Sequence, residues 1–271
     1  MTARNLKGVN NMEEHGLHLA DENYFESFRV LIDNMAKGHS HIDSNLKFTD
    51  CGMAALFFNN VFLFKPFLEV TEKVSQAKRY FSEVGRSFRV VVREEYSGVV
   101  DRAANQLCLK KVDSVPLMIH QSLSELQAPS DFNFLQVNDD KTLQDYRDVM
   151  ASAFVFPEWL IEKVLSKGLL KEQHVVMLVG YEKGVACTGA MLIQQGDLAG
   201  IYWVGTKQGY ERKGLAAKAT TQAILIGRER GCTWSVLQAS DQGMPVYQRM
   251  GFETVAHYHY QVYQPLVAEA E

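Results

Sequence analysis

The sequence lacks any apolar run long enough to cross a membrane. Its longest candidate, residues 52–64, is interrupted by Asn59-Asn60 and falls well short of the roughly 18–20 residues that a spanning helix needs. No basic and apolar signal segment opens the chain. We therefore expect neither a membrane partner nor export.

Closely spaced cysteines are also absent. The four that occur (Cys51, Cys108, Cys187 and Cys232) are scattered and form no C-x-x-C pair. This spacing argues against a zinc finger or a disulfide framework and suits a reducing compartment, so we expect the protein in the cytoplasm.

Pairs of histidines at i, i+2 occur twice, as His39/His41 and His257/His259. Alternate residues of a strand share a face, so either pair could point the same way. However, no third ligand lies nearby in sequence and neither pair has a zinc spacing. We favour solvated or packed histidines and expect no metal.

An excess of basic residues is missing as well. Asp and Glu outnumber Lys and Arg by 32 to 28, and the net charge is -4 with a pI near 6.1. A nucleic acid is therefore not expected as the main partner. With 46% hydrophobic and 22% charged residues, the chain has the composition of a globular protein with complete cores.

A length of 271 residues suggests two domains. The polar segment 127–131, which contains Pro129, is the best boundary. We expect a loose leader over 1–20, an N-terminal domain over 21–126 and a C-terminal domain over 132–271.

The N-terminal half alternates strand and helix patterns. We expect Asp21 to cap a helix over 22–37, because apolar residues recur there at helical spacing. Further along the chain the patterns predict strands at 53–58 and 61–64, joined by a tight turn at Asn59-Asn60 or forming one bulged strand. Strands are also expected at 87–93 and 112–120, and helices at 68–84 and 98–109.

The C-terminal half predicts an antiparallel run of strands followed by a strand–loop–helix unit. Strands are expected at 132–137, 175–181, 185–194, 198–206, 233–238 and 253–264, with helices at 139–154 and 157–165. A long helix follows the glycine-bearing loop at 209–216 and ends before Gly231. The fold class predicted for the whole chain is α/β.

The loop before that long helix is suited to phosphate, because the first amides of a helix lack partners within it. Gly209 and Gly214 have the spacing of a P-loop, but Leu215-Ala216 replaces its Lys-Ser/Thr, which argues against a nucleotide triphosphatase. No G-x-G-x-x-G is present, so a Rossmann site is excluded too.

At this loop the sequence resembles the GCN5-related N-acetyltransferase family. Its signature Arg/Gln-x-x-Gly-x-Gly/Ala is matched by Glu211-Arg-Lys-Gly214-Leu-Ala216, with Glu in the first position. A second stretch, Ala239 to Gly251-Phe252, resembles the family's late helix and the Gly-Phe that follows it. The order of elements between the two motifs agrees throughout.

The resemblance implies a mixed, mostly antiparallel sheet flanked by helices and a site for acetyl-CoA. The residues it assigns to cofactor binding lie on the strand before the loop, on the loop and before the late helix: Val204, Gly205, Thr206, Glu211, Arg212, Lys213, Gly214, Leu215, Ala216 and Ser240. Ser240 could instead cap the late helix, and the cap alone is the more economical account. For the N-terminal half it suggests a degenerate copy of the same fold, and an unrelated α/β cap is the alternative.

For catalysis the resemblance assigns Tyr247 as the proton donor to the leaving thiolate, since a phenol stays protonated at neutral pH. No carboxylate lies within 201–206, so the base is open: Asp197 or Asp241 could act through water, or the acceptor could arrive neutral. Phe154, Phe156 and Trp159 are candidates for the acceptor wall, and core packing is an equal alternative.

These observations predict an enzyme that moves an acetyl group from acetyl-CoA to a primary amine of a small molecule or a protein, as a monomer or a homodimer. The alternative from another class is a noncatalytic CoA-binding sensor or interaction module on the same fold.

Overall fold

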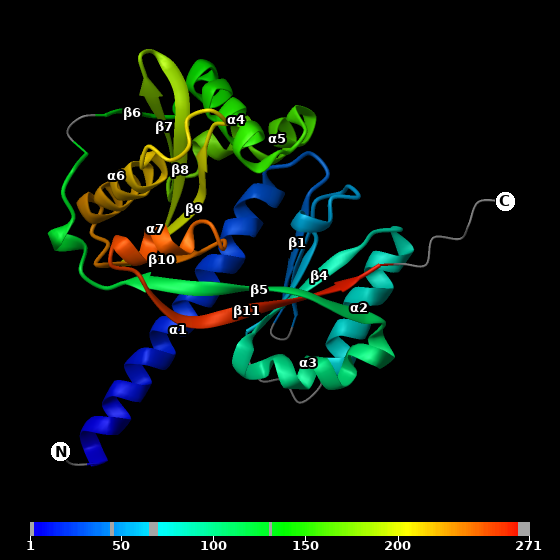
Figure 1. Cartoon of the computed structure of the whole chain (residues 1–271). Coiled ribbons are helices and arrows are strands. Elements are labelled where there is room, and N and C mark those ends of the chain that lie inside the picture. Colours follow the sequence, from blue (N-terminus) through cyan, green and yellow to red (C-terminus); the bar gives the residue numbers. More distant parts are fainter. Residues whose placement is uncertain (1–2, 44–45, 65–69, 130–131, 265–271) are drawn as a thin grey trace. The chain divides into compact units, whose positions relative to one another are not determined.

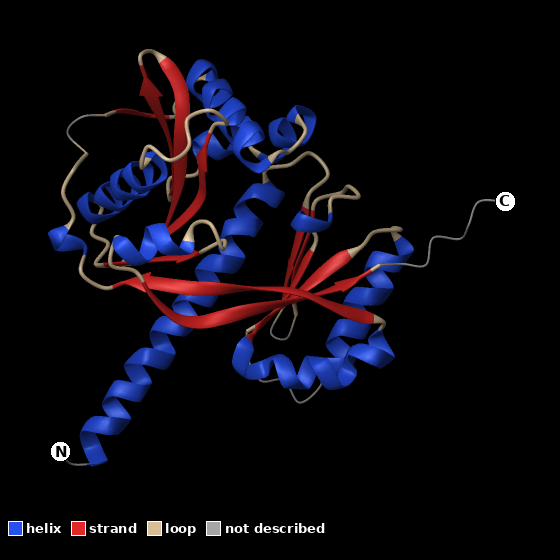
Figure 2. Ribbon diagram, viewed as in Figure 1, coloured by secondary structure: helices blue, strands red, loops and turns tan. Residues whose placement is uncertain are grey.

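The computed structural model describes residues 3–43, 46–64, 70–129 and 132–264 (Figures 1 and 2). The chain divides into two compact units. The first unit combines Met1–Ser27 with Met118–Glu253, and the second combines Phe28–Leu117 with Thr254–Glu271. The chain thus leaves the second unit at Met118, ahead of the expected linker, of which residues 130–131 lie outside the described residues.

A five-stranded sheet organises the first unit. Its strands follow the order β6 (Asn133–Gln136), β7 (Val175–Glu182), β8 (Val185–Gln195), β9 (Leu198–Thr206) and β10 (Trp234–Gln238). Neighbours from β6 to β9 are antiparallel, whereas β9 and β10 run parallel. A parallel pair needs a crossover, which α6 (Leu215–Glu229) provides.

Helices cover both faces of this sheet. On one face α4 (Asp140–Phe154) begins at a capping box between Asp139 and Thr142. The short α5 (Glu158–Val164) follows it after Pro157. On the other face α6 packs closely, since a Cβ on Gly227 would lie 3.0 Å from the methyl group of Ala199. This unit also contains α7 (Met244–Arg249) and the short 3₁₀ turns Leu123–Glu125 and Lys167–Lys171.

The N-terminal segment differs from the expectation of a loose leader over 1–20. One helix, α1, runs over Ala3–Asp33. Asp21, expected as its N-cap, lies in the middle of the helix and is 1% exposed. An Asp ahead of an apolar periodic run is the usual start signal, but here the helix continues upstream and the carboxyl is a buried polar group.

The second unit holds a sheet in the order β1 (His39–Ile42), β2 (Lys47–Asp50), β3 (Asn60–Leu63), β4 (Phe88–Arg93) and β11 (Glu253–Tyr263). The β3–β4 pair is parallel and the other neighbours are antiparallel. Its helices are α2 (Val70–Glu83) and α3 (Glu94–Leu107), and β5 (Leu109–His120) follows α3. Sequence reasoning missed β1 and β2.

The strand expected over 53–58 is not formed; its end is a 3₁₀ turn, Leu56–Phe58. The cause is Asn59. Its side chain accepts a hydrogen bond from Cys51 N at 2.9 Å and donates to Met53 O at 3.0 Å. These bonds offer the backbone an alternative to a strand ladder. Asn60, expected in the turn, instead begins β3 and pairs with Arg89.

Each unit thus contains an antiparallel run that ends in a parallel strand–helix–strand unit, β9–α6–β10 in the first and β3–α2–β4 in the second. The residues before α2 differ from those before α6. Residues 63–69 contain no glycine, whereas 209–216 contain two. A phosphate-binding loop of the same type is therefore absent from the sequence ahead of α2.

Within the described ranges, no helix has the length and apolar character to cross a membrane. Over those ranges, too, the side chains form no group of three or more His, Cys, Asp or Glu that could hold a metal ion.

Candidate functional site

The central feature of the site is the separation of β9 from β10. The two strands pair over three residues, from Leu198–Trp234 to Gly200–Val236. Beyond that point β9 continues to Thr206 and β10 to Gln238 without further pairing between them. Part of the β9 backbone between Ile201 and Thr206 is therefore left without β10 as its neighbour.

A β-bulge lies in the same part of β9. Tyr202 pairs with Met191 and Gly205 with Gly189, so Trp203 and Val204 together face a single residue of β8. Trp203 has φ of +48°, a backbone conformation that is rare for a bulky residue.

Two side-chain hydrogen bonds from residues of the first unit fix the backbone at the bulge. The buried phenol of Tyr146, on α4, donates to Trp203 O at 3.3 Å, and Thr188 Oγ1 donates to Gly205 O at 2.8 Å. Gly205 also lets α4 approach, because a Cβ there would lie 2.9 Å from Ala153 Cβ. The bulge is thus a fixed feature of the fold.

The loop after β9 ends in an exposed helix N-terminus. Gly214 is the N-cap of α6 with φ of +72°, and no side chain caps it. Lys218 N donates to Gly214 O at 3.1 Å. The amides of Leu215, Ala216 and Ala217 precede this first helical bond and point to the end of the helix, where the macrodipole favours an anion.

Glu211 and Lys213 hold the loop in shape. The carboxylate of Glu211 accepts from Gly209 N at 2.8 Å, so this unusual residue of the motif is engaged with the loop's own backbone. Lys213 Nζ lies 2.7 Å from Glu182 Oε2 and 4.9 Å from the centre of the Tyr210 ring. The hydrogen bond with Glu182 is the main cause of the raised pKa of Lys213. Arg212, with φ of +61°, completes the turn.

The loop fits a phosphate-bearing ligand. A Cβ built on Gly209 or Gly214 would meet no heavy atom within 4 Å, so space is open in front of both residues. Both have positive φ, which favours glycine. An open glycine backbone beside free helical amides is the arrangement that holds phosphate groups.

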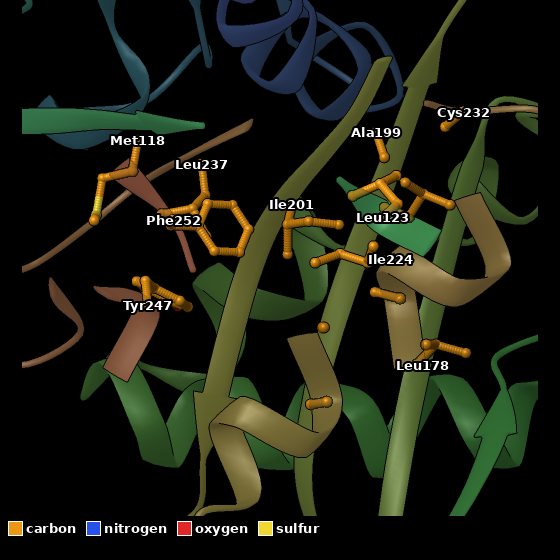
Figure 3. Close-up of a cluster of buried hydrophobic side chains, with 14 of the residues drawn as sticks. Met118, Leu123, Leu178, Ala199, Ile201, Ile224, Cys232, Leu237, Tyr247 and Phe252 are labelled. Atoms are coloured by element: carbon orange, nitrogen blue, oxygen red, sulfur yellow. The ribbon is translucent and has the colours of Figure 1, made fainter. Parts of the chain in front are cut away.

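Tyr247 lies on α7 within the core cluster that joins α6, β9 and β10 (Figure 3). Its side chain is 9% exposed and its ring makes an edge contact with Phe252 at 5.9 Å. The ring fits closely, since a Cβ on Gly243 would lie 2.9 Å from it. Burial raises the pKa of Tyr247 to about 12, so the phenol keeps its proton at neutral pH.

Thr220, on α6, is a partner of this phenol that sequence reasoning did not identify. Its hydroxyl interacts with Tyr247 and opposes the rise in the pKa of the phenol. Thr220 Oγ1 is fully buried and makes no hydrogen bond of normal geometry to the described residues. The sequence did carry a signal for this partner, because Thr220 is a polar residue on the apolar face of a predicted helix.

Ser240 has the geometry of a cap. Its Oγ accepts from Gly243 N at 3.1 Å, and its carbonyl accepts from Met244 N at 2.8 Å. Of the two candidate bases, Asp197 accepts from Thr233 Oγ1 at 3.0 Å in an exposed turn, and Asp241 is exposed.

The histidine pairs also have local partners. His41 stacks on Phe48 with ring centres 4.9 Å apart, and His257 Nδ1 lies 3.2 Å from Glu94 Oε2.

Two of the three acceptor-wall candidates share a cluster with Trp203. The Phe154 ring lies 5.4 Å from Trp203 and 6.2 Å from Phe156, centre to centre. Trp159 is 53% exposed, and its ring lies 5.2 Å from Lys163 Nζ.

Comparisons with known proteins agree with this geometry. Residues 139–252 match the acetyltransferase (GNAT) family. A GCN5-related N-acetyltransferase from Kribbella flavida superposes with a TM-score of 0.68 at 16% identity, over 92% of this chain and 96% of that one. Another from Sphaerobacter thermophilus gives 0.59 at 12% identity, over 83% and 82%.

A tandem GNAT protein from the clavulanic acid biosynthesis pathway gives a TM-score of 0.58 at 9% identity, covering 83% of this chain and 79% of that one. No curated protein matches the sequence. At these identities the superpositions establish the fold, a mixed α/β architecture with a mostly antiparallel sheet flanked by helices. The family match and the fold together show that residues 139–252 form a domain of the acetyltransferase (GNAT) family.

Proposed function

We propose that the protein is an acetyl-CoA-dependent N-acetyltransferase that modifies a primary amine of a small molecule or a protein. The observation that carries the proposal is that a bulged, partly unpaired strand leads directly into a loop with an open helix N-terminus. The bulge at Trp203–Val204 and the open N-terminus of α6 at Gly214 are close in sequence, and β9 has left β10 at this point.

Different residues would bind different parts of CoA. The backbone of Val204, Gly205 and Thr206 would pair with the amide groups of the pantetheine arm, as a strand pairs with its neighbour. The loop from Glu211 to Ala216 would hold the pyrophosphate through its amides. Arg212 and Lys213 add positive charge, and Ser240, whose hydroxyl accepts from Gly243 N before α7, would hydrogen-bond the pantetheine arm.

Transfer needs a neutral amine, a stabilised carbonyl oxygen and a proton for the sulfur. The amine nitrogen attacks the thioester carbonyl, the C–S bond breaks, and the leaving sulfur takes a proton from Tyr247. A phenol with a pKa of about 12 is a weak acid beside a thiol of ordinary pKa near 8.5. Proton transfer from this phenol to a thiolate is uphill by itself, so it must be coupled to return of the proton that the attacking amine loses, which reaches the phenolate through water.

Two further features accompany the proposal. All four cysteines are free, which suits the cytoplasm. For the second unit we propose a degenerate copy of the acetyltransferase fold, based on its parallel β3–α2–β4 unit. The absence of glycine from 63–69 implies that this copy does not hold CoA.

The test combines a binding measurement with a turnover measurement on the full chain. Calorimetry with CoA should show one site, and thiol release from acetyl-CoA should depend on an added amine. The amine panel should include aromatic, aliphatic, polyamine and aminosugar acceptors and a lysine peptide. Binding of CoA without turnover of any amine would contradict the enzyme and indicate a noncatalytic CoA-binding module.

A further inference from the structure

Thr220 carries a buried hydroxyl without a hydrogen-bond partner. It lies in the second turn of α6 and is 0% exposed, and its Oγ1 makes no hydrogen bond of normal geometry to the described residues. A threonine inside a helix ordinarily donates to a carbonyl three or four residues earlier. Because the Thr220 hydroxyl has left water without gaining a bond, it destabilises the folded state.

Comparable threonines of the described residues are satisfied. Thr188 Oγ1 donates to Gly205 O at 2.8 Å, and Thr49 Oγ1 donates to Phe58 O at 3.2 Å. Both residues are 0% exposed, as Thr220 is. Among these fully buried threonines the missing bond is therefore particular to Thr220, and it asks for a reason other than the fold.

The group beside this hydroxyl is the phenol of Tyr247, on α7. Burial raises the pKa of the phenol to about 12, and the Thr220 hydroxyl acts in the opposite direction. A donor has this effect because it favours the phenolate over the phenol. The Tyr247 ring is fixed in place, since it makes an edge contact with Phe252 and a Cβ on Gly243 would lie 2.9 Å from it. The two hydroxyls are thus held as neighbours by α6 and α7.

We propose that Thr220 is a positioning residue for proton transfer by Tyr247, and that its hydroxyl donates a hydrogen bond to the phenolic oxygen as this oxygen becomes an anion. The inference rests on the proposed N-acetyltransferase function and deepens it, because it adds a second residue to the proton donor.

The bond forms at the step that needs it. The amine nitrogen bonds to the acetyl carbon, the C–S bond breaks, and Tyr247 gives its O–H proton to the sulfur. The electron pair of that O–H bond stays on the phenolic oxygen, to which Thr220 donates while keeping its own proton. The proton lost by the amine reaches the phenolate through water. A donor that is unpartnered at rest and bonded in the transition state lowers the barrier without tightening substrate binding.

The kinetic test uses Thr220→Val, which removes the hydroxyl and keeps the β-branched shape. The kcat should fall about 10- to 100-fold, as expected for loss of a hydrogen bond to a charged group. The KM for acetyl-CoA and the calorimetric Kd for CoA should stay within about twofold, because only the transition state loses an interaction. Thr220→Ser keeps the hydroxyl and should have a kcat within about threefold of wild type.

A stability measurement needs no turnover. Thr220→Val should melt at or above the Tm of wild type, because it removes a buried polar group that has no partner. Thr49→Val is the matched control: its hydroxyl is equally buried but bonded, so its loss should lower the Tm by about 2–4 °C and leave kcat unchanged. A loss in Thr220→Val as large as that in Thr49→Val would show that the Thr220 hydroxyl serves the fold.

A double variant tests whether Thr220 acts through Tyr247. In Tyr247→Phe there is no phenolate to stabilise, so adding Thr220→Val should change kcat by less than about twofold. If the two losses in kcat multiply instead, Thr220 acts independently of Tyr247 and the proposal is wrong.

The outcomes separate this proposal from the proposed function. If the wild type acetylates an amine and Tyr247→Phe is slow, but Thr220→Val keeps kcat within about threefold, the role of Thr220 is wrong while the acetyltransferase function stands. If CoA binds but no amine is acetylated, the proposed function fails and the role of Thr220 fails with it.

Discussion

Gly214 and Gly231 mark the two ends of α6 and share the same backbone constraint. Their φ values are +72° and +93°, and a Cβ on either would meet no heavy atom within 4 Å. A substitution therefore brings the same kind of backbone strain, about 1–3 kcal/mol, at both ends. Only Gly214 stands where an anion would approach the helical amides.

Gly214→Val should therefore abolish CoA binding, raising the dissociation constant at least about 100-fold, because the side chain fills the space in front of the loop amides. Gly231→Val should lose a similar amount of stability and keep its affinity. Calorimetry gives the CoA affinity of each variant, and thermal melts give its stability. Equal affinities in two folded variants would refute the phosphate-loop interpretation.

Glu211 gives a second test at the loop, since its carboxylate holds Gly209 N but stands near the proposed pyrophosphate. Glu211→Gln keeps an acceptor and removes a negative charge, so CoA should bind about two- to fivefold more tightly at low salt. Glu211→Ala removes the acceptor too and should bind more weakly than Gln. Identical affinities for the two variants would show that the hydrogen bond has no role.

Tyr247→Phe removes one hydroxyl and keeps the packed ring. Loss of a general acid typically costs about 10²–10⁴ in rate, and here kcat should fall with little change in KM for acetyl-CoA. A kcat within about threefold of wild type, which is under about 1 kcal/mol in barrier, would defeat the proton-donor role and leave the fold unaffected.

The same tyrosine makes a prediction about pH. Since burial raises the pKa of the phenol to about 12, its acid form persists above the usual value near 10. Activity that depends on the acid form should therefore not decline between about pH 8 and pH 10 through this group. A basic limb in this range that disappears in Tyr247→Phe would contradict the raised pKa.

Among the elements, α1 is the one that most changes how the first unit is understood. Asn23 reaches β9 and β8 from this helix. Its Oδ1 accepts from the Tyr202 phenol at 2.7 Å, and its Nδ2 donates to Ile193 O at 3.2 Å. Gly200 makes room, because a Cβ there would lie 1.8 Å from Asn23 Oδ1. The helix therefore supports the strand that carries the bulge.

Breaking this contact should destabilise the first unit. Tyr202→Phe leaves Asn23 Oδ1 buried without the phenol, which costs about 1–3 kcal/mol. Urea denaturation followed by tryptophan fluorescence should show the loss. Tyr181→Phe removes a phenol bonded to Asp145 at 2.7 Å on a less buried strand end and serves as the control, with a smaller loss. Equal losses would mean that α1 is not held through Asn23.

At the scale of the whole molecule, local patterns predicted the C-terminal elements closely. Leu198–Thr206 was expected residue for residue, since its β-branched and aromatic run is bounded by turn signals. The helix expected over 139–154 is observed as Asp140–Phe154, because its apolar spacing is also a local pattern. The phosphate loop could be proposed for the same reason, as its glycines precede a periodic helix.

What could not be predicted depends on contacts between distant residues. Asn23 meets Tyr202 across 179 positions, so α1 gave no sign of belonging with β9. The bulge at Trp203 arises from register against β8, and a single strand carries no signal for it. The strand expected over 53–58 does not form, because the Asn59 side chain donates hydrogen bonds to Met53 O and Ser87 O. Strand propensity gives no indication of such bonds.

The division into two units leads to a last prediction for the intact chain. CoA should protect amides against hydrogen exchange in 201–218 and in α7, because the β9 bulge, the loop and the Tyr247 helix all belong to the first unit. The second unit should show little change in β3, α2 and β4, since residues 63–69 offer no glycine loop for phosphate. Hydrogen exchange measured by mass spectrometry on the full-length protein, with and without CoA, gives the protection in each unit. Protection of α2 equal to that of α6 would mean that the second unit also binds CoA.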